Sequence, residues 1–348
     1  MGATNPEIQA ARQDFYERIA TGSCTPLWEV LGVIVPESPP ALCKPYLWKW
    51  KTVWPWIQQA GELITAKQAE RRVLVLENPG LPGKSRITQS LYAGLQLILP
   101  GEVAPTHRHS QSALRFVMHG SGAYTAVDGQ KVKMNVGDFV ITPQFMWHDH
   151  GNTSNEPMVW LDGLDLPIVE MFNAQYFEKY EADTQKVNRS ERLNLAMFGN
   201  AMKPVEYTRK SKTSPLFWYP YERTLEALHV LRHAQDAHPS WGYKLQYVNP
   251  VTGGWPMPSI GTFMQLLPAG FKGKAYQATD STVFSVVEGS GKCTVGGVTL
   301  EFNAKDVFVC PSWMPYSFEA LTECVLFSYS DRPAQQALDL WREADSQI

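Results

Sequence analysis

Short runs of hydrophobic residues, separated by turn residues, dominate the chain from Arg71 onward. They form two blocks, one from RVLVLE to MVWLDGLDLP (72–167) and one from IGTFMQLLPAG to CVLFSYSD (260–331). Closely spaced short strands of this kind are typical of an all-β sandwich or barrel. The pattern therefore predicts a fold dominated by β-strands that fall into two groups.

Three other segments have the pattern of helices. Residues 7–21 carry apolar residues at near-helical spacing and are followed by Gly22, which predicts an amphipathic helix and its end. RTLEALHVLRHAQ (223–235) predicts a helix within an otherwise irregular stretch. RPAQQALDLWREADS (332–346) predicts a C-terminal helix.

The stretch from Pro26 to Pro55 is rich in proline and tryptophan. Its tryptophans and the one that follows are Trp28, Trp48, Trp50, Trp54 and Trp56. We interpret the stretch as a long arm packed on a larger body, in preference to a binding platform, because aromatic side chains serve readily as packing. Aromatic residues are also enriched where subunits meet, so the arm suggests a subunit contact.

The two β blocks resemble each other. LQLILPG (95–101) matches MQLLPAG (264–270), RFVMHGSG matches FSVVEGSG, and GDFVITP matches KDVFVCP, at a nearly constant offset. Three ordered matches at one offset indicate an internal repeat. We therefore predict two copies of one small β-barrel joined by a partly helical linker.

This organisation gives five segments. They are an N-terminal helix and arm (1–70), a first barrel (71–168), a partly helical linker (169–246), a second barrel (247–331) and a C-terminal helix (332–348).

Composition narrows the class of protein. The formal net charge is −3 and no long Lys/Arg run occurs, which argues against binding to nucleic acid or to a membrane surface. The longest uncharged run, 248–271, contains four prolines and cannot be one membrane helix. The N-terminus has no apolar core of a secretory signal, and the five cysteines are scattered. Both features predict a cytoplasmic protein with reduced thiols.

Three histidines in the first block have the spacing of metal ligands. The block contains Gly101-x5-His107-x-His109 and, later, Gly137-x5-Pro143-x4-His148-x3-Asn152. These patterns resemble the two motifs of the cupin superfamily of jelly-roll barrels. His107 and His109 are two residues apart, so on an extended strand they share a face. Neutral imidazoles suit a divalent ion of iron, copper, nickel or zinc.

The block departs from the usual cupin motifs at two positions. Ala113 stands where a glutamate is usual, and Phe145 replaces a glycine. A neutral three-histidine site would leave three positions of a six-coordinate ion open, enough for a bidentate anionic substrate and O2. In the second block the ligand positions correspond to Tyr276, Ala278 and Tyr316, which predicts a metal-free barrel.

Longer stretches make the resemblance more specific. RVLVLENPGL, SLYAGLQLILPGEVAPTHRHSQSALRF and GDFVITPQFMWHDHGN are similar to the gentisate 1,2-dioxygenase family, which includes salicylate and 1-hydroxy-2-naphthoate dioxygenases. The resemblance implies a bicupin fold, one Fe(II) per chain and a homotetramer. It also implies extradiol-type, O2-dependent cleavage of a small aromatic hydroxy acid, as in aromatic hydrocarbon catabolism.

For gentisate (2,5-dihydroxybenzoate), the family's cleavage lies between the carboxyl-bearing carbon and the ortho-hydroxyl-bearing carbon and gives maleylpyruvate. The same chemistry on salicylate, a 5-substituted salicylate or 1-hydroxy-2-naphthoate is the alternative. A non-enzymatic ligand-binding bicupin is a more distant alternative.

The resemblance also suggests pocket residues. Arg115 lies in an apolar run six residues after His109, on the same face if the strand is unbroken, and would bind the substrate carboxylate. Arg71 matches a second carboxylate-binding position, although the register leaves Arg72 as an alternative. Gln96 interrupts an apolar strand and would contact the substrate.

Three further residues complete the predicted pocket. Tyr92 shares the face of Gln96 and offers a hydroxyl to a polar ring substituent, which favours gentisate. His150, two residues after His148, would hydrogen-bond the substrate hydroxyl or the reacting oxygen. Asp162 matches a polar position near the family pocket.

Overall fold

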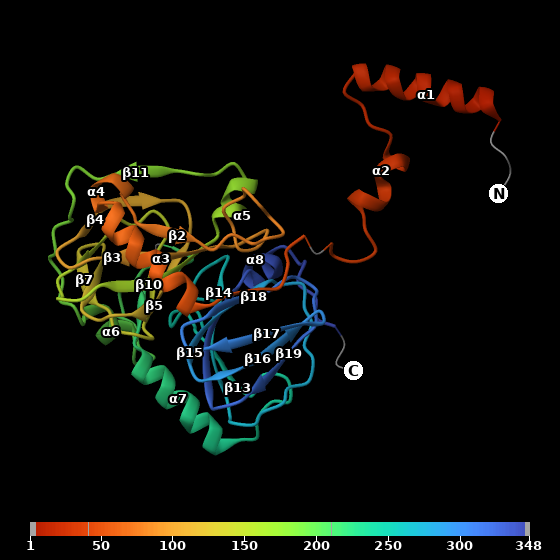
Figure 1. Cartoon of the computed structure of the whole chain (residues 1–348). Helices are drawn as coiled ribbons and strands as arrows, with labels where there is room; N and C mark the ends of the chain where they lie inside the picture. Colours follow the sequence, from red (N-terminus) through yellow and green to blue (C-terminus); the bar gives the residue numbers. More distant parts are fainter. Residues whose placement is uncertain (1–4, 41, 210, 345–348) are drawn as a thin grey trace. The chain divides into compact units, whose positions relative to one another are not determined.

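The computed structural model describes residues 5–40, 42–209 and 211–344. The chain divides into two compact units, Met1–Pro40 and Ala41–Ile348 (Figure 1).

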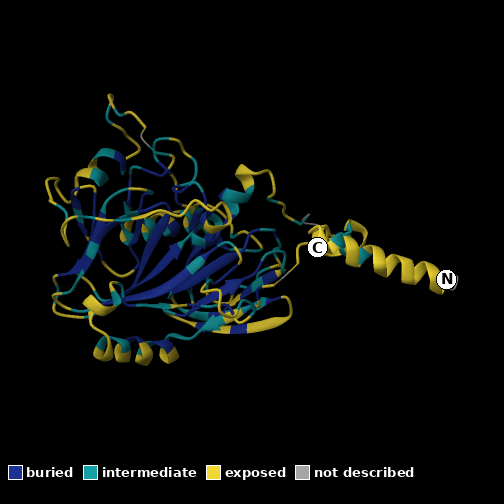
Figure 2. Ribbon diagram, turned by 90° about the horizontal axis from the view of Figure 1, so that it is seen from above, coloured by how far each residue is buried: buried dark blue, intermediate teal, exposed yellow. Residues whose placement is uncertain are grey.

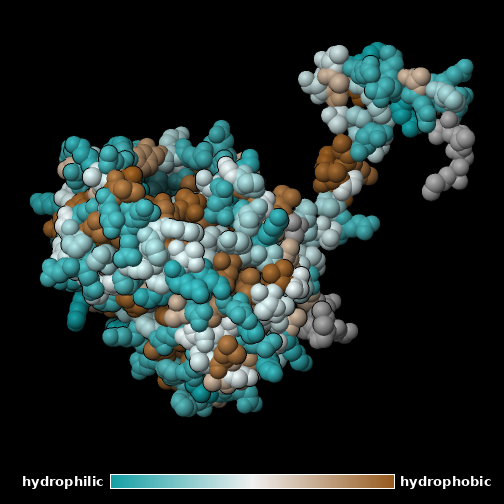
Figure 3. All heavy atoms as spheres, in the orientation of Figure 1, coloured by the Kyte–Doolittle hydropathy of each residue, from teal (hydrophilic) through white to brown (hydrophobic). Residues whose placement is uncertain are grey.

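The first unit contains two helices, α1 (Pro6–Thr21) and α2 (Leu27–Ile34). The helix predicted over 7–21 is confirmed. The side chain of Asn5 accepts a hydrogen bond from the backbone N–H of Glu7 and caps α1, and Pro6 occupies its first turn. The helix α2 is apolar, and its described residues are exposed or half-buried (Figure 3).

The second unit is built on two β-barrels of the jelly-roll type, as predicted. In the first barrel, one sheet has the order β12-β8-β5-β10-β3-β2 and faces a sheet with the order β11-β4-β9-β6-β7. The strands of the first sheet are β2 (Val73–Val75), β3 (Tyr92–Ile98), β5 (Ala113–His119), β8 (Phe139–Thr142), β10 (Met158–Leu164) and β12 (Trp218–Tyr219). Those of the facing sheet are β4 (Val103–His109), β6 (Ala123–Val127), β7 (Gln130–Lys133), β9 (His148–Asn152) and β11 (Phe177–Lys179).

The second barrel repeats this order. Its large sheet runs β1-β18-β15-β20-β14-β13, and its small sheet runs β17-β16-β19. The strands are β1 (Tyr46–Trp48), β13 (Tyr243–Gln246), β14 (Gly261–Leu267), β15 (Thr282–Glu288), β16 (Ser290–Val295), β17 (Val298–Asn303), β18 (Val307–Cys310), β19 (Tyr316–Ala320) and β20 (Cys324–Ser330). The run β8-β5-β10-β3-β2 thus corresponds to β18-β15-β20-β14-β13. This correspondence confirms the repeat.

One hydrophobic core joins the two barrels. The large sheets share a cluster of buried residues, in which the rings of Phe116 on β5 and Phe327 on β20 stack with centroids 4.1 Å apart. The hydroxyl of Tyr329 donates to the backbone carbonyl of Tyr92, 2.9 Å away, at the start of β3. Figure 2 shows the strands as the buried layer and the helices as more exposed elements. The second barrel therefore supports a strand of the first.

The arm from residue 42 onward packs on this body. The strand β1 adds to the edge of β18, and α3 (Trp50–Leu63) buries Val53 and Ile57. The backbone N–H of Trp50 donates to a carboxylate oxygen of Asp306 at 2.7 Å. The expected packing of the arm is confirmed for this part, whereas Trp28 of the first unit is 65% exposed.

The remaining helices are short, apart from one. They are α4 (Ala66–Ala69), α5 (Leu166–Met171), α6 (Leu193–Phe198), α7 (Tyr221–Ala234) and α8 (Arg332–Ala337). The helix α7 confirms the one predicted over 223–235, and in Figure 1 it leads from the first barrel to the second. The predicted C-terminal helix (332–348) is confined to α8, because a turn at Leu338 and Asp339 ends it.

Within the described part of the chain, no helix is both long and apolar enough to cross a membrane. All five cysteines, each in a described range, are free thiols.

We predict that Phe327→Ala will lower the free energy of unfolding by about 3–5 kcal/mol, because it leaves a cavity in the core shared by the barrels. The matched control is Phe172→Ala, since Phe172 is 60% exposed and its loss is expected to change stability by about 0.5 kcal/mol or less. Urea unfolding measures the free energy of unfolding of both variants. Equal losses would show that the shared core is not a main source of stability.

Candidate metal centre and substrate pocket

A cavity of about 460 Å³ lies between the two sheets of the first barrel. Strands β3, β5 and β10 line one side and β4 lines the other. Its walls include Arg71, Tyr92, Gln96, His107, His109, Arg115 and Asp162. Seven of the nine predicted site residues therefore line one space.

The three predicted ligands converge beside this cavity. His107 and His109 lie on β4, and His148 begins β9, which pairs with β4 so that His107 and His148 are opposite each other. Potential ligand atoms of the three imidazoles lie within 4.8 Å of one another. In the described ranges this is the one group of three or more such side chains that could hold a metal ion.

Each of these rings is oriented by a backbone carbonyl. The Nδ1 atoms of His107, His109 and His148 lie 3.0, 3.1 and 2.9 Å from the carbonyl oxygens of Pro105, Gln111 and Met146, respectively. A neutral imidazole that donates from Nδ1 has its lone pair on Nε2. Such outer hydrogen bonds fix the tautomer and direction of metal-ligating histidines.

The environment keeps the three rings neutral. Burial lowers the pKa of His107 to about 2, with a further contribution from the positive Arg71. Burial and Arg115 lower that of His109 to about 4, and burial and His107 hold the pKa of His148 well below its usual value. Neutral imidazoles are the form that binds metal.

This donor set fits a metal ion. The Nε2 atom of His148 is buried and has no hydrogen-bond partner among the described residues, as expected of a ligand atom. Three neutral nitrogens suit a divalent transition metal and leave open positions toward the cavity.

An aspartate that the sequence analysis missed supports the ligand strands. Asp149, between His148 and His150, is buried and accepts hydrogen bonds from Thr106 on β4 and from Gln185 in the linker. It therefore ties β4, β9 and the linker together behind the histidines. Its position between two predicted site histidines is the one signal that could have revealed it.

Arg115 reaches the cavity by a route that the sequence analysis did not foresee. The strand is not unbroken, because β4 ends at His109 and the chain crosses to the other sheet before β5 begins at Ala113. Arg115 therefore faces the histidines from the opposite sheet. Its Nη1 donates to the hydroxyl of Thr142, and its Nε lies 3.4 Å from a carboxylate oxygen of Asp162.

Asp162 is opposite Arg115 in the register of β10 and β5. Its Oδ1 also accepts a hydrogen bond from the indole of Trp160 at 3.0 Å. Burial raises the pKa of Asp162 to about 6, against the opposing effect of Arg115. The pair fixes the guanidinium in position without occupying all of its donors.

The structure decides between the two adjacent arginines. Arg71 lines the cavity, and its Nη2 lies 3.4 Å from the carbonyl of Pro105, the same carbonyl that orients the ring of His107. Arg72 is turned away and forms a two-pronged ion pair with Glu102, with distances of 3.0 and 2.7 Å. Arg71 is therefore the available cation at this edge of the cavity.

Gln96 and Tyr92 share a face of β3, as expected. Gln96 is almost fully buried, and its amide oxygen has no partner in the part of the chain that the structure describes. Gly94 lies between them, and a Cβ there would come 2.7 Å from the Tyr92 hydroxyl and 2.4 Å from a methyl group of Val73. A glycine is therefore needed for Tyr92 to lie across this strand.

His150 is fully buried, so it is not an exposed loop residue. Its Nδ1 lies 2.9 Å from the hydroxyl of Thr125, and its Nε2 has no partner among the described residues. The ring packs between His148 and Trp160. Unlike the other pocket candidates, His150 is not part of the cavity wall itself.

Comparisons with known proteins identify the family of the chain. The family description "Cupin domain" matches residues 94–164. Gentisate 1,2 dioxygenase 1 of Aquipseudomonas alcaligenes is 53% identical over 97% of this chain and 98% of that protein. The 5-aminosalicylate 1,2-dioxygenase of Comamonas sp is 32% identical, over 94% and 88%, respectively.

A solved structure extends the likeness to the fold. Salicylate 1,2-dioxygenase from Pseudoaminobacter salicylatoxidans, crystallised as an adduct with gentisate, superposes with a TM-score of 0.91 at 35% identity. The match covers 100% of this chain and 96% of that one.

The chain belongs to the gentisate 1,2-dioxygenase family. The family resemblance and the cupin fold expected from the sequence are thereby confirmed.

The rim of the dioxygenase cavity contains residues that the sequence analysis missed. Phe177 on β11 stacks against His107 with ring centroids 5.4 Å apart, and its backbone pairs with that of His109. Tyr176 and Gln175 lie beside it on the rim. They come from the irregular linker, where no periodic pattern indicated a strand.

We predict that His148→Ala will lose bound metal, because two remaining imidazoles form too weak a site. The control is His233→Ala, whose imidazole is exposed on α7 and should leave the metal content unchanged. Metal analysis of the two purified variants measures the effect. A full complement of metal in His148→Ala would exclude this residue as a ligand.

Proposed function

We propose that this protein is an Fe(II)-dependent, extradiol-type gentisate 1,2-dioxygenase. The observation that carries the proposal is a cavity lined by two guanidinium groups and by two members of a cluster of three neutral, converging imidazoles. The likeness to curated gentisate dioxygenases supports the same function. The proposed reaction joins O2 to gentisate and opens the ring between the carboxyl-bearing and ortho-hydroxyl-bearing carbons to give maleylpyruvate.

Charge complementarity favours an aromatic hydroxy acid. Arg71 and Arg115 are cationic and Asp162 is their one partner of opposite charge in the cavity wall, so the described lining groups retain an excess positive charge. The metal ligands themselves are neutral. A substrate carboxylate balances this charge, and a guanidinium can bind it with two parallel hydrogen bonds.

In the proposed mechanism His107, His109 and His148 hold the ferrous ion. When bound, the ion brings the substrate and O2 together and polarises both. Arg115 binds the substrate carboxylate, with its own orientation fixed by Thr142 and Asp162. The free amide oxygen of Gln96 accepts a hydrogen bond from the substrate. His150 lies behind the cavity wall, and in the proposed complex its unpartnered Nε2 would hydrogen-bond the substrate hydroxyl or the reacting oxygen.

Tyr92 is the proposed source of preference for gentisate. Its hydroxyl lies over Gly94 on the cavity face of β3, and burial raises its pKa, so it stays protonated and can donate. A ring hydroxyl at position 5 is a suitable partner. Salicylate, a 5-substituted salicylate and 1-hydroxy-2-naphthoate are alternative substrates for the same chemistry.

The location, co-substrate and assembly of the proposed enzyme are inferred from its family. We infer a cytoplasmic catabolic enzyme, with O2 as co-substrate, that assembles as a homotetramer. The exposed apolar residues of the first unit support assembly, because Leu27, Leu31 and Ile34 on α2 are each about half exposed or more.

We predict that the iron-loaded protein will consume equimolar O2 and gentisate, and that it will turn over salicylate more slowly. Tyr92→Phe should lower kcat/KM for gentisate by roughly twofold to tenfold, the effect of one neutral hydrogen bond, and leave salicylate nearly unchanged. An oxygen electrode measures O2 uptake with each of the two substrates. Absence of O2 uptake with every hydroxybenzoate would overturn the proposed function, and an equal loss for the two substrates would overturn the role of Tyr92.

We predict that Arg115→Ala will keep its iron but lose about tenfold to a hundredfold in kcat/KM, because a charge-assisted hydrogen bond to the substrate is lost. Arg115→Lys should recover only part, since an ammonium lacks the planar fork. The control is Arg108→Ala, whose side chain pairs with Glu178 outside the cavity. Equal weakening of ligands with and without a carboxylate would make Arg115 a structural residue.

A further inference from the structure

The interior of the second barrel contains polar side chains that the barrel's own packing does not explain. Gln265 on β14 is fully buried, and both its amide oxygen and its amide nitrogen lack partners among the described residues. The hydroxyl of Ser328 on β20 is equally buried and unpartnered. Buried polar groups are nearly always hydrogen-bonded, because leaving them unpaired is costly.

A cation faces the same interior. Lys244 on β13 is directly opposite Gln265 in the register of β13 and β14, so the two side chains share a face. Its ammonium lies 4.5 Å from the ring centroid of Phe263 and 6.0 Å from that of Phe284. Ser328 pairs with both of these phenylalanines and therefore faces the same interior.

These positions correspond to the pocket wall of the first barrel. Gln265 stands on β14 where Gln96 stands on β3, at the offset of the internal repeat. Lys244 is paired with Gln265 as Val73 is paired with Gln96. Ser328 follows the partner of Gln265 by two residues, as Asp162 follows the partner of Gln96. The second barrel thus has polar groups where the first is proposed to hold substrate.

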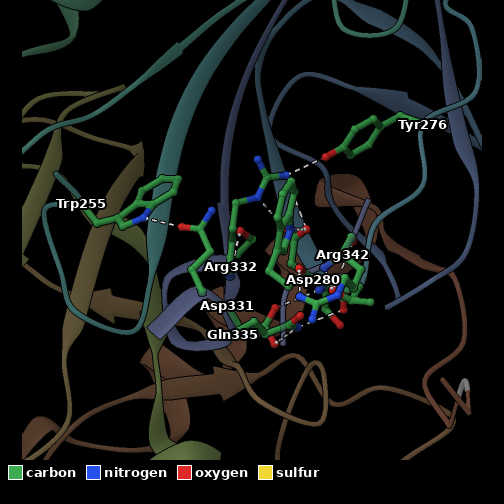
Figure 4. A network of polar contacts seen from close by, with 12 residues as sticks. Trp255, Tyr276, Asp280, Asp331, Arg332, Gln335 and Arg342 are labelled. Carbon is green, nitrogen blue, oxygen red and sulfur yellow. Dashed lines mark hydrogen bonds and ion pairs between the residues drawn. The ribbon is translucent and has the colours of Figure 1, made fainter. Parts of the chain in front are cut away.

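The charges around Lys244 leave it without a counterion of its own. Arg332 is the neighbouring cation, and it forms an ion pair with Asp280 at 3.3 Å and donates to the hydroxyl of Tyr276 at 2.9 Å (Figure 4). Asp280 also accepts a hydrogen bond from the indole of Trp341. Burial lowers the pKa of Lys244 to about 8, with Arg332 acting in the same direction.

Other acidic groups do not reverse this balance. Asp331 lies close to Asp280 and accepts hydrogen bonds from the hydroxyl of Ser90, the backbone N–H of Ser281 and the amide of Gln335, and it forms no ion pair with Lys244 within the described ranges. Cys310, which also faces Lys244, is a buried thiol whose pKa burial raises well above its usual value, so it is neutral. In the described part of the chain, Arg332 pairs with the carboxylate of Asp280, and the Lys244 ammonium forms no ion pair.

We propose that the interior of the second barrel binds a small monocarboxylate, with the Lys244 ammonium, the Gln265 amide N–H and the Ser328 hydroxyl as its donors. A single negative charge would give the Lys244 ammonium the counterion that the described residues do not supply. The rings of Phe263 and Phe284 contact the apolar part of the ligand. The amide oxygen of Gln265 accepts from Lys244, so each unpartnered group obtains a partner.

Acetate is the probe, and thermal unfolding of the iron-loaded protein at constant ionic strength is the measurement. A ligand that binds the folded state raises Tm with its concentration. Lys244→Met should require roughly tenfold to a hundredfold more acetate for the same rise in Tm, because it loses the charged donor. Ser328→Ala should also require more acetate for the same rise in Tm, but by a smaller factor than Lys244→Met.

Two comparisons separate this site from the first barrel. Arg115→Ala, which alters the first pocket, should keep the acetate response that depends on Lys244, whether or not the proposed activity is correct. Without acetate, Lys244→Met should be at least as stable as the wild type, because a half-buried cation that forms no ion pair is removed. An equal acetate response in the wild type and Lys244→Met, or no response in either, would overturn the proposal and leave water as the partner of these groups.

Discussion

Three hydrogen bonds from imidazole to backbone determine what the first barrel can do. Each joins the Nδ1 of one histidine to a carbonyl near its own strand, and together they direct three Nε2 lone pairs toward one point. The carbonyl of Pro105 belongs to β4, and those of Gln111 and Met146 lie just after β4 and just before β9. The direction of the ligands is therefore set by the backbone within and immediately beside the two ligand strands, and no carboxylate ligand is needed to orient them.

The internal repeat shows how one framework supports different chemistry. Corresponding strands have the same order in the two barrels, yet the ligand positions hold three imidazoles in one and two phenols and a methyl group in the other. In the second barrel Tyr276 pairs with Tyr316 across the sheet edge and accepts a hydrogen bond from Arg332. This barrel also contributes the hydroxyl of Tyr329, which holds the backbone of Tyr92, so its packing stabilises a wall of the other barrel's pocket.

Local patterns in the sequence were sufficient to predict the positions of several site residues. Alternation along β3 placed Gln96 and Tyr92 on one face, and motif spacing brought together three histidines from two strands. The route of Arg115 could not be predicted by alternation, because the chain changes sheets between His109 and Ala113. Phe177 was missed because β11 exists only through its pairing with β4, a contact between distant segments that leaves no periodic pattern in the linker.

The absence of a carboxylate at Ala113 changes where charge must be balanced. With neutral ligands, the balancing anion must come from the cavity or from the substrate. The cavity's carboxylate, Asp162, is already paired with Arg115, and its pKa is raised to about 6 by burial. A second anion brought close to Asp162 would raise that pKa further, unless Arg115 and Arg71 screen the two from each other. In the proposed function the two guanidinium groups would therefore do more than attract a carboxylate, because they would also allow it to bind next to a carboxylate that is already present.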